Sequence, residues 1–550
     1  AHLHPLIGDL DIQIEGKAAA VAEMGSYDPI DMERFIDLEP KSLSGDVTGE
    51  VEARIPLERG SELKDLNWRV DLAYTGLSID KPFEGQLVTE AKGTISARPD
   101  RALIQATAKL NDVPAEISLS EPLQGGAKRS LTARLHFDNA ARERLLPGLS
   151  SVVSGPFVVE LEALGEGRQK VEVDLADTTL ALPWLGWSKG AGVAARASFV
   201  LSSKDAVTRL ADFRLDGSGF GAAGDLTVDD DGLAGAQFSR FALNRGDDAR
   251  ASIERRRGGY MISVSGKSLD ARPFIRRFGD LTGAKPAKSS DPDVDISLDA
   301  RITEMGGFHD EVLKDVKLAY SAAGTTVGGI RASATTRTGA RVTVVDTTAG
   351  SGRKVEAQAG DIGAVLRFLD VYENLHGGTA TLSLSGAADG PLAGQIDVRN
   401  FAIVNEARLQ SIVSKPPPGA DRSLNQAVRR DLDVSQAKFE RGFARVEKGA
   451  DYLSVSDGVV RGPTIGSTFQ GKVFDGDGNM AITGTFMPAY GLNRIFGEIP
   501  ILGQILGNGR DRGLIGITFK LSGKTSEPQL AINPLSIVAP GIFRSIFEYR

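Results

Sequence analysis

The residues that come closest to a nucleotide site lie at 466–472 (GSTFQGK). This string resembles a phosphate-binding loop, in which backbone amides at the start of a helix hold phosphates and a Ser or Thr hydroxyl coordinates magnesium. Val473 stands where that hydroxyl is needed, and the pattern that follows predicts a strand instead of a helix. We therefore expect no phosphate-binding loop here.

A second cluster, Asp475, Asp477 and Asn479, has the spacing that begins a calcium-binding loop. That loop requires a glycine where Met480 stands and a bidentate glutamate where Phe486 stands. A hairpin turn explains the three polar residues better. No calcium site is expected.

The five histidines are scattered, with His2 and His4 near the start and His136, His309 and His376 apart from one another. Metal binding and nucleophilic catalysis need converging side chains, and no spacing here predicts them. Cysteine is absent, which excludes disulfides, thiol nucleophiles and cysteine-based metal sites. We expect no catalytic residues, no metal and no cofactor, and hence a protein that is not an enzyme.

Length and charge narrow the classes further. A chain of 550 residues exceeds one ordinary core, so it forms several domains or one elongated object. The formal net charge is −8 and no domain is strongly basic, so no nucleic acid is expected as a partner. No run of 18 apolar residues could span a bilayer as a helix. The chain starts with Ala and soon reads as a strand, which predicts a fragment or processed form whose targeting segment is missing.

Apolar and polar residues alternate in strand-length pieces along the chain, as around Ile296 and Leu298, which are flanked by Asp295, Ser297 and Asp299. Successive side chains of a strand face opposite sides of a sheet, so each piece has one apolar face and one polar face. Asp-Gly, Gly-Gly and Asn-Asp pairs mark hairpin turns between the pieces. The apolar-face positions are Val47, Val51, Val70, Leu72, Leu135, Val159, Leu161, Val171, Val173, Leu175, Val294, Ile296, Leu298, Leu382, Leu384, Ile396, Val398, Ile515, Ile517 and Phe519.

Helix signals are few and similar to one another. An Asp in the N-cap position opens a short segment that mixes Arg with Phe or Leu, and an alternating strand follows. This order, strands then one short helix then strands again, suggests a degenerate repeat, although Asp caps helices in many proteins. The helices are predicted near 31–38, 138–146, 270–278 and 361–375, and loops or linkers at 283–293 and 415–423.

The last 150 residues carry a more specific signal. Residues 487–507 read MPAYGLNRIFGEIPILGQILG, and residues 513–547 begin GLIGITFKLSGK and continue to Phe547. Together with Ile396-Asp397-Val398 upstream, this region resembles the C-terminal region of the AsmA-like family, in particular its YhdP-type members. The resemblance covers 395–550. Over 1–394 the resemblance is limited to the general pattern of alternating strands and short Asp-capped helices.

That resemblance implies a fold and a function. AsmA-like proteins are similar to bridge-like intermembrane lipid transfer proteins, in which a long, curled, twisted antiparallel β-sheet forms an elongated hydrophobic groove with a few capping helices. It implies phospholipid transport between the inner and outer membranes of a Gram-negative bacterium, supporting outer-membrane integrity. The protein would lie in the periplasm, held by an inner-membrane anchor that this chain lacks. The apolar-face positions above then become candidate groove-lining residues.

Other readings stay open. The same alternation builds ordinary β-sandwiches, in which a second sheet covers the first. An envelope scaffold could instead assemble outer-membrane β-proteins by strand addition at a free sheet edge, with envelope proteins as partners. A polysaccharide-active protein would need clustered carboxylates with aromatic platforms, and the chain has only three Trp.

Two segments near the end are amphipathic at helical spacing. Their apolar faces could dock on a membrane or a partner protein, or simply pack on the sheet. The candidate docking residues are Ile495, Phe496, Ile499, Ile542, Phe543, Ile546 and Phe547.

Overall fold

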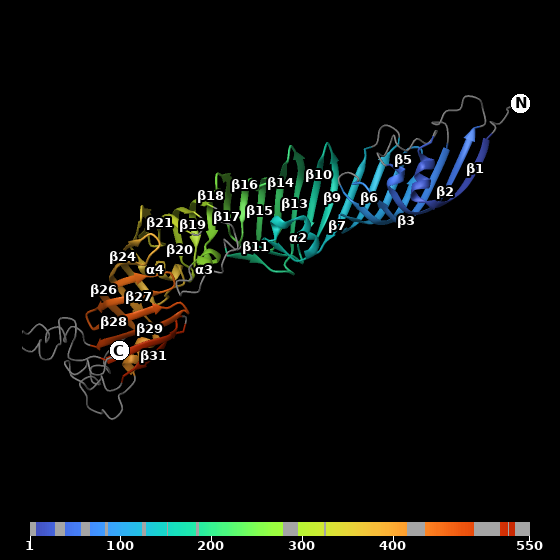
Figure 1. Ribbon diagram of the computed structural model, residues 1–550. Helices are drawn as coiled ribbons and strands as arrows, with labels where there is room; N and C mark the ends of the chain where they lie inside the picture. The colour runs from blue at the N-terminus through green and yellow to red at the C-terminus, as the bar shows by residue number, and fades with distance from the viewer. Residues whose placement is uncertain are drawn as a thin grey trace, which may run out of the picture. The chain divides into compact units, whose positions relative to one another are not determined.

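Most of the residues that the structure describes are in β-strands (Figure 1). Twenty-eight strands belong to one open, twisted and mainly antiparallel sheet, and three short strands form a second sheet. The prediction of a mainly β chain with a twisted antiparallel sheet is confirmed. The computed structural model describes residues 7–27, 39–56, 67–82, 86–123, 128–150, 152–182, 186–278, 295–323, 326–414, 435–488, 517–525 and 527–533.

Contacts within the chain divide it into two compact units. The first comprises Ala1–Pro183 and Trp187–Phe238, and the second Trp184–Gly186 and Ser239–Arg550. The division falls inside β16 (Gly232–Ala242). The boundary that the sequence predicts at 394/395 lies within β25 (Leu392–Val404), which pairs along its length with both β24 and β26. That boundary marks where the resemblance to the AsmA-like family begins, and it stays a prediction.

In the first unit the main-sheet strands pair antiparallel with their neighbours in chain order, from β1 to β15. Asn111 and Asp112 join two of them with φ of 49° and 63°, as a two-residue turn of mirror-image type requires. The small sheet, β8, β11 and β12, interrupts the order. The strands are β1 (Ile7–Lys17), β2 (Leu43–Pro56), β3 (Asn67–Ile79), β4 (Val88–Ala97), β5 (Arg101–Leu110), β6 (Val113–Pro122), β7 (Ser130–Phe137), β8 (Val153–Ser154), β9 (Phe157–Gly165), β10 (Arg168–Asp174), β11 (Thr179–Leu182), β12 (Trp187–Lys189), β13 (Ala195–Lys204), β14 (Val207–Gly217) and β15 (Phe220–Asp229).

The second unit continues the same pattern from β17 to β31, with one exception: β18 and β19 pair in parallel. A parallel neighbour cannot be reached by a hairpin and needs a crossover, and α3 (Arg272–Phe278) lies in this connection. The strands are β17 (Asp248–Arg256), β18 (Gly259–Asp270), β19 (Asp295–Gly306), β20 (Val312–Ala323), β21 (Thr326–Thr335), β22 (Arg341–Ala349), β23 (Gly352–Ala359), β24 (Leu375–Ala387), β25, β26 (Gln436–Lys448), β27 (Leu453–Arg461), β28 (Ile465–Phe474), β29 (Asn479–Pro488), β30 (Ile517–Lys524) and β31 (Gln529–Ile532).

Three of the predicted helices are confirmed: α2 (Asn139–Leu145), α3 and α4 (Ile362–Phe368). Asp138 and Asp361 cap α2 and α4, accepting hydrogen bonds from the amides of Ala141 at 2.8 Å and Ala364 at 3.0 Å. The α4 helix is shorter than expected, because β24 already begins at Leu375. The predicted helix at 31–38, and the linkers at 283–293 and 415–423, lie outside the described residues.

Two helices were not predicted. The α1 helix (Ala18–Gly25) follows Lys17, whose side chain makes no capping hydrogen bond, so the usual start signal is missing. The α5 helix (Ala407–Ser414) begins after Glu406, whose carboxylate accepts a hydrogen bond from the amide of Arg408 at 3.1 Å.

Several strands contain a residue with left-handed backbone in their interior, among them Asp212, Asp315, Asn400 and Asp457. Pairing registers shift at or near several of these positions, as β-bulges do. Each bulge changes which residues face the core. In β14, Leu210 and Phe213 are half-buried on either side of the exposed Asp212, so the alternation changes phase there.

Candidate functional site

The strand registers of the first unit align apolar residues into rows that cross neighbouring strands on one face. Residues that lie opposite each other in a ladder share a face, so the rows follow directly from the pairings. Every member of the two rows below is buried or half-buried. One row is Val47, Tyr74, Gly93, Ala106, Ile117, Ala133, Leu161, Val171 and Phe199, and a second is Ala108, Ala115, Leu135, Val159, Val173, Ala197, Leu215 and Ala222.

The predicted apolar-face residues of this unit fall on these rows or next to them. Val51 lies opposite Val70, and Leu72 lies opposite Gly49 and Ile95. Leu175 is buried directly after β10. These predicted residues therefore share one face of the described sheet, and their role as a lipid-groove lining stays a prediction.

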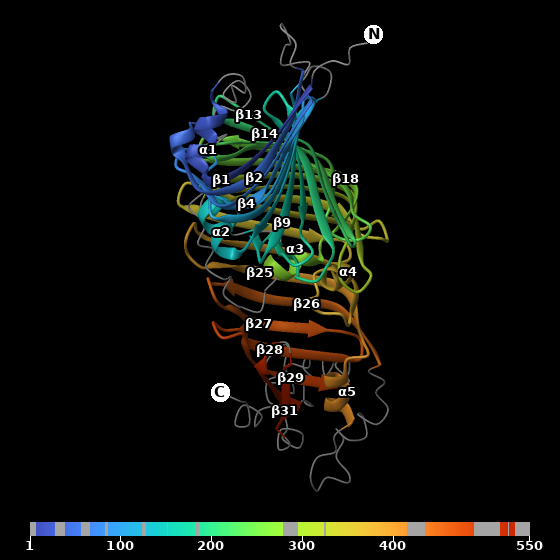
Figure 2. The ribbon, with the colours of Figure 1, turned by 90° about the vertical axis from the view of Figure 1, so that its right-hand side faces the viewer.

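Two short helices cover parts of this face. Ala18 of α1 packs with Val47, Tyr74, Ala91 and Ala108, and Figure 2 shows α1 beside β1, β2 and β4. Ala141 of α2 packs in the same way against Val113, Ala115 and Leu135. Val47 and Leu135 are thus in contact with helices, whereas Val51, Val70, Val159 and Val173 remain half-buried.

The second unit has rows of the same kind. Residues predicted from the alternation lie opposite one another, as with Leu382 and Ile396 or Leu298 and Tyr320. One row is Ala251, Val264, Ala300, Leu318, Ala332, Val344, Ala357, Leu382, Ile396 and Ala444. A neighbouring row is Ile253, Ile262, Leu298, Tyr320, Ile330, Asp346, Val355, Leu384, Gly394 and Val446.

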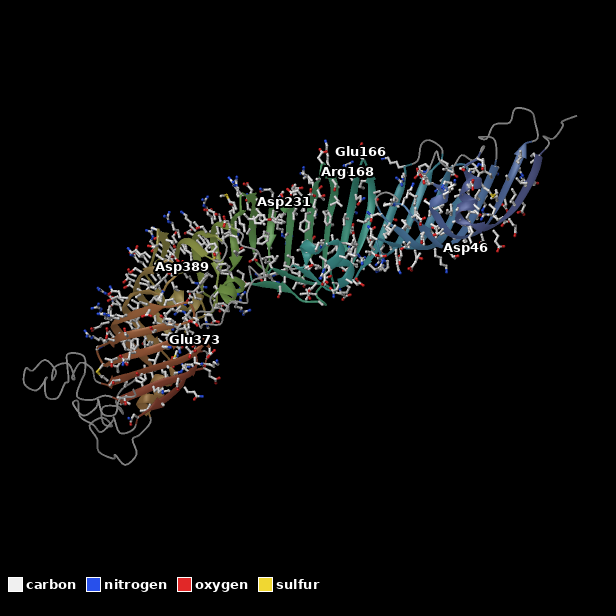
Figure 3. The ribbon with its side chains drawn as sticks, viewed as in Figure 1. Asp46, Glu166, Arg168, Asp231, Glu373 and Asp389 are labelled. Atoms are coloured by element: carbon white, nitrogen blue, oxygen red, sulfur yellow. The ribbon has the colours of Figure 1, made fainter. Side chains whose placement is uncertain are left out.

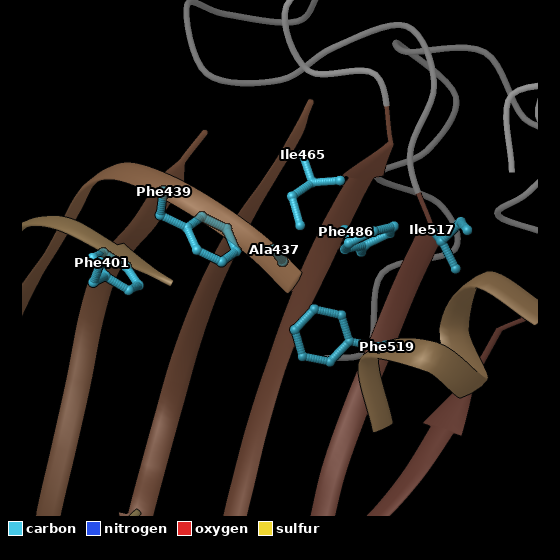
Figure 4. Close-up of a cluster of buried hydrophobic side chains, with 7 residues drawn as sticks. All are labelled: Phe401, Ala437, Phe439, Ile465, Phe486, Ile517 and Phe519. Atoms are coloured by element: carbon cyan, nitrogen blue, oxygen red, sulfur yellow. The ribbon is translucent and has the colours of Figure 1, made fainter. Parts of the chain in front are cut away.

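The apolar face of the second unit ends in a packed cluster (Figure 4). The rings of Phe401 and Phe439 are stacked with centroids 5.0 Å apart, and Leu409 of α5 packs against the cluster. Of the predicted lining residues, Ile517 and Phe519 lie in this cluster, where they are buried by neighbouring side chains. The cluster comprises Phe401, Ala437, Phe439, Ile465, Phe486, Ile517 and Phe519.

Three charged side chains interrupt the rows of the second unit, and the alternation did not predict them. Asp346 is buried and lies between Ile330 and Val355 in its row. Arg353 and Lys448 lie in an adjacent row with Thr348, Gly386, Leu392, Leu453 and Phe474. A basic pair such as Arg353-Lys354 gives no sign of which residue faces inward until the phase of the strand is known.

The opposite face is polar and carries exposed ion pairs, among them Lys170 with Glu172 at 2.9 Å and Arg54 with Asp9 at 2.9 Å. The hydrogen bond and charge of Lys170 lower the pKa of the Glu172 carboxyl. Charged residues also gather at the turns, where Figure 3 labels Glu166, Arg168 and Asp389. Such exposed pairs contribute little to stability, so they mainly keep this face in water.

Two buried polar groups elsewhere find their partners within the fold. The Lys189 ammonium donates to the carbonyls of Leu175, Ala176 and Thr178. Glu406 accepts hydrogen bonds from the Tyr372 hydroxyl at 2.7 Å and the Asn374 amide at 3.2 Å. These contacts fix turns and helix ends, and they present no reactive group to a ligand.

Nothing in the described part of the chain groups three or more potential metal ligands. Residues 466–472 lie in β28, and Asp475 accepts hydrogen bonds from the amides of Asp477 and Asn479, as a turn requires. The described helices are all too short or too polar to cross a membrane.

Some predicted site residues lie outside the described residues. They are Val294 and Ile515 of the apolar-face set, and all the candidate docking residues: Ile495, Phe496, Ile499, Ile542, Phe543, Ile546 and Phe547.

Comparisons with known proteins give no neighbour. No family model matches the chain, and neither a curated protein nor a solved structure is detectably similar to it.

Proposed function

We propose that the apolar face binds the acyl chains of phospholipids and carries them between the inner and outer membranes of a Gram-negative cell, supporting outer-membrane integrity. The observation that carries the proposal is the alignment of apolar residues in rows that cross many neighbouring strands on one face. Val159, for instance, lies opposite both Leu135 and Val173. The resemblance of residues 395–550 to the AsmA-like family supports the periplasmic location and the inner-membrane anchoring.

The energetics of lipid transfer suit such rows. Each methylene moved into water costs about 0.8 kcal/mol, so exposing a sixteen-carbon chain costs about 12 kcal/mol. A continuous apolar surface lowers that penalty at every step along its length. The rows consist largely of Val, Ile, Leu and Ala, which offer a smooth surface without deep pockets where a chain would be trapped.

Photo-crosslinking at paired positions tests the proposal. Val173 lies on the apolar face and Glu172 beside it on the polar face, and Ile296 and Asp295 form the same pair in the second unit. With a photoreactive amino acid at each position in cells, we expect lipid adducts at Val173 and Ile296 and none at Glu172 and Asp295. Adducts at the polar positions only, or no lipid bound to the purified chain in native mass spectrometry, would contradict the proposal.

A charge on the apolar face tests transport itself. Ile296→Glu places a carboxylate opposite Tyr260 on the apolar face, and Ser297→Glu on the polar face of the same strand is its control. We expect Ile296→Glu to abolish lipid transfer between labelled vesicles while the circular dichroism spectrum stays that of a β-protein. Equal transfer by the two variants would argue against a path along this face.

The edge strand β1 supports a second candidate, strand addition to envelope β-proteins. Leu10 and Ile12 on β1 are 43% and 41% exposed, although their row neighbours are half-buried. Proline at Gln13 would block backbone pairing along β1. If strand addition is the function, Gln13→Pro abolishes client binding and leaves lipid adducts at Val173 unchanged.

A further inference from the structure

The second unit places two cationic side chains, Arg353 and Lys448, on its apolar face. Their side chains follow the inward phase of their strands: Val355 and Ala357 continue the same face as Arg353, and Val446 the same face as Lys448. Burying charge among hydrocarbon is costly unless the charge is paired. Their presence on this face therefore calls for a partner.

One of the two cations, Arg353, is paired with a carboxylate of the protein. Its guanidinium donates through Nε to Asp346 Oδ1 at 3.0 Å and through Nη2 to Oδ2 at 2.6 Å. This bidentate pair fixes the side chain and raises the pKa of Arg353 through the hydrogen bonds with Asp346. Nη1 takes no part in the pair, and 28% of the side chain stays accessible.

Lys448 lies three strands away in the same row. Its ammonium donates to the backbone carbonyls of Gly449 and Ala450, and it lies 5.6 Å from the centre of the Phe474 ring. Among the described residues no carboxylate is within ion-pair distance of it, although Asp451 is near enough to favour its charge. Burial lowers the pKa of Lys448, and the charge of Arg353 lowers it further. An incoming anion would relieve both effects.

The residues between the two cations are apolar side chains or glycines. Gly386 and Leu392 separate Arg353 from Lys448 along the row, and the next row carries Val355, Leu384 and Gly394. Asp346 pairs with Arg353, and Asp451 acts on Lys448 only from beyond ion-pair distance, so among the described residues this site offers an ammonium without a directly paired carboxylate beside apolar side chains. An anionic group joined to an acyl chain is complementary to it in both charge and polarity.

We propose that Lys448 binds the phosphate of a phospholipid headgroup, with Arg353 adding positive charge from three strands away in the same row and the acyl chains lying along the adjoining apolar rows. The site deepens the proposed function and rests on it. It makes the second unit selective for lipids with an anionic headgroup. The described rows of the first unit, in contrast, bind acyl chains without distinguishing between headgroups.

The test compares two lipids with the same two sixteen-carbon chains, phosphatidylglycerol and diacylglycerol, by native mass spectrometry of the full chain. We expect the wild type to bind phosphatidylglycerol about tenfold more tightly than diacylglycerol, as one charge-assisted hydrogen bond allows. Lys448→Met should abolish that preference without changing diacylglycerol binding. Lys438→Met, which removes an exposed lysine from the same strand, should leave it intact.

Lys448→Arg guards against loss of folding, because it keeps the charge and the donors to the turn; we expect it to retain the preference. A preference unchanged in Lys448→Met would overturn the inference. Inorganic phosphate that binds as tightly as phosphatidylglycerol would assign the site to a free anion and overturn it as well. Failure of both lipids to bind would instead refute the proposed function, whereas equal binding of the two would refute only the headgroup site.

Discussion

The two units present apolar faces of different content. In the first unit the two rows described above carry no charged side chain and are mostly aliphatic or small, and the helices that contact them do so through Ala18 and Ala141. In the second unit the rows contain Asp346, Arg353 and Lys448 and end in a phenylalanine cluster. Alternation thus determines which face is apolar, but the residues along each row determine what that face can bind.

Among the substitutions that test this comparison, we expect the largest loss of stability in the phenylalanine cluster of the second unit. Phe439→Ala removes a buried ring that stacks on Phe401, which costs about 3–5 kcal/mol of unfolding free energy. Hydrogen exchange of the amides in β25–β27 measures the loss, and exchange in β5–β7 of the first unit should stay unchanged.

Val345→Ala is the control for that truncation, because Val345 lies in the second unit but is 37% exposed on the other face. It should cost less than about 1 kcal/mol. A comparable loss in the two variants would mean that the cluster does not anchor the second unit.

The sequence predicted the apolar face because burial of one face imposes a period of two, which Ile296 and Leu298 display plainly. It predicted α2 and α4 because Asp138 and Asp361 offer a capping oxygen where the apolar pattern changes. In each case a single local rule, read over a few residues, agreed with the tertiary structure.

The features that the sequence did not predict depend on contacts between residues that are far apart in the chain. An Asn or Asp in left-handed conformation, such as Asn400 or Asp457, looks in sequence like a hairpin turn and not like a bulge inside a strand. The inward phase of Arg353 follows only from its register opposite Gly386. The parallel pairing of β18 with β19 is likewise a tertiary choice that no local pattern carries.

The two capped helices sharpen the comparison with an effect of intermediate size. Asp138→Ala and Asp361→Ala each remove a capping hydrogen bond and should cost about 1 kcal/mol. Because α2 lies in the first unit and α4 in the second, each variant should speed exchange only in its own unit, at β7 or at β24. Replacement of either Asp by Asn should restore most of the loss, since the amide oxygen still accepts. Equal loosening of both units by one variant would show that their stabilities are coupled.

The smallest expected effect is a dependence on acid confined to the second unit. Burial disfavours the charge of Glu406, but hydrogen bonds from Tyr372, Arg408 and Asn374 outweigh it and hold the pKa of its carboxyl below the ordinary value of a glutamate. A carboxyl with a lowered pKa stabilises the fold fully above its unfolded-state pKa, and that contribution fades as the pH falls through the folded-state value.

Hydrogen exchange at the end of β25 and in α5 should therefore quicken as the pH falls below the ordinary pKa of a glutamate, beyond its intrinsic pH dependence, by an amount equivalent to about 1 kcal/mol or less. Glu406→Gln cannot ionise, so it should exchange faster at pH 7 and lose this extra dependence on acid. Glu440→Gln, which alters an exposed carboxyl in β26, should behave as the wild type. Should Glu406→Gln keep the acid dependence of the wild type, the carboxylate would not hold α5 in place, and the packing of Leu409 on the phenylalanine cluster would be its main anchor.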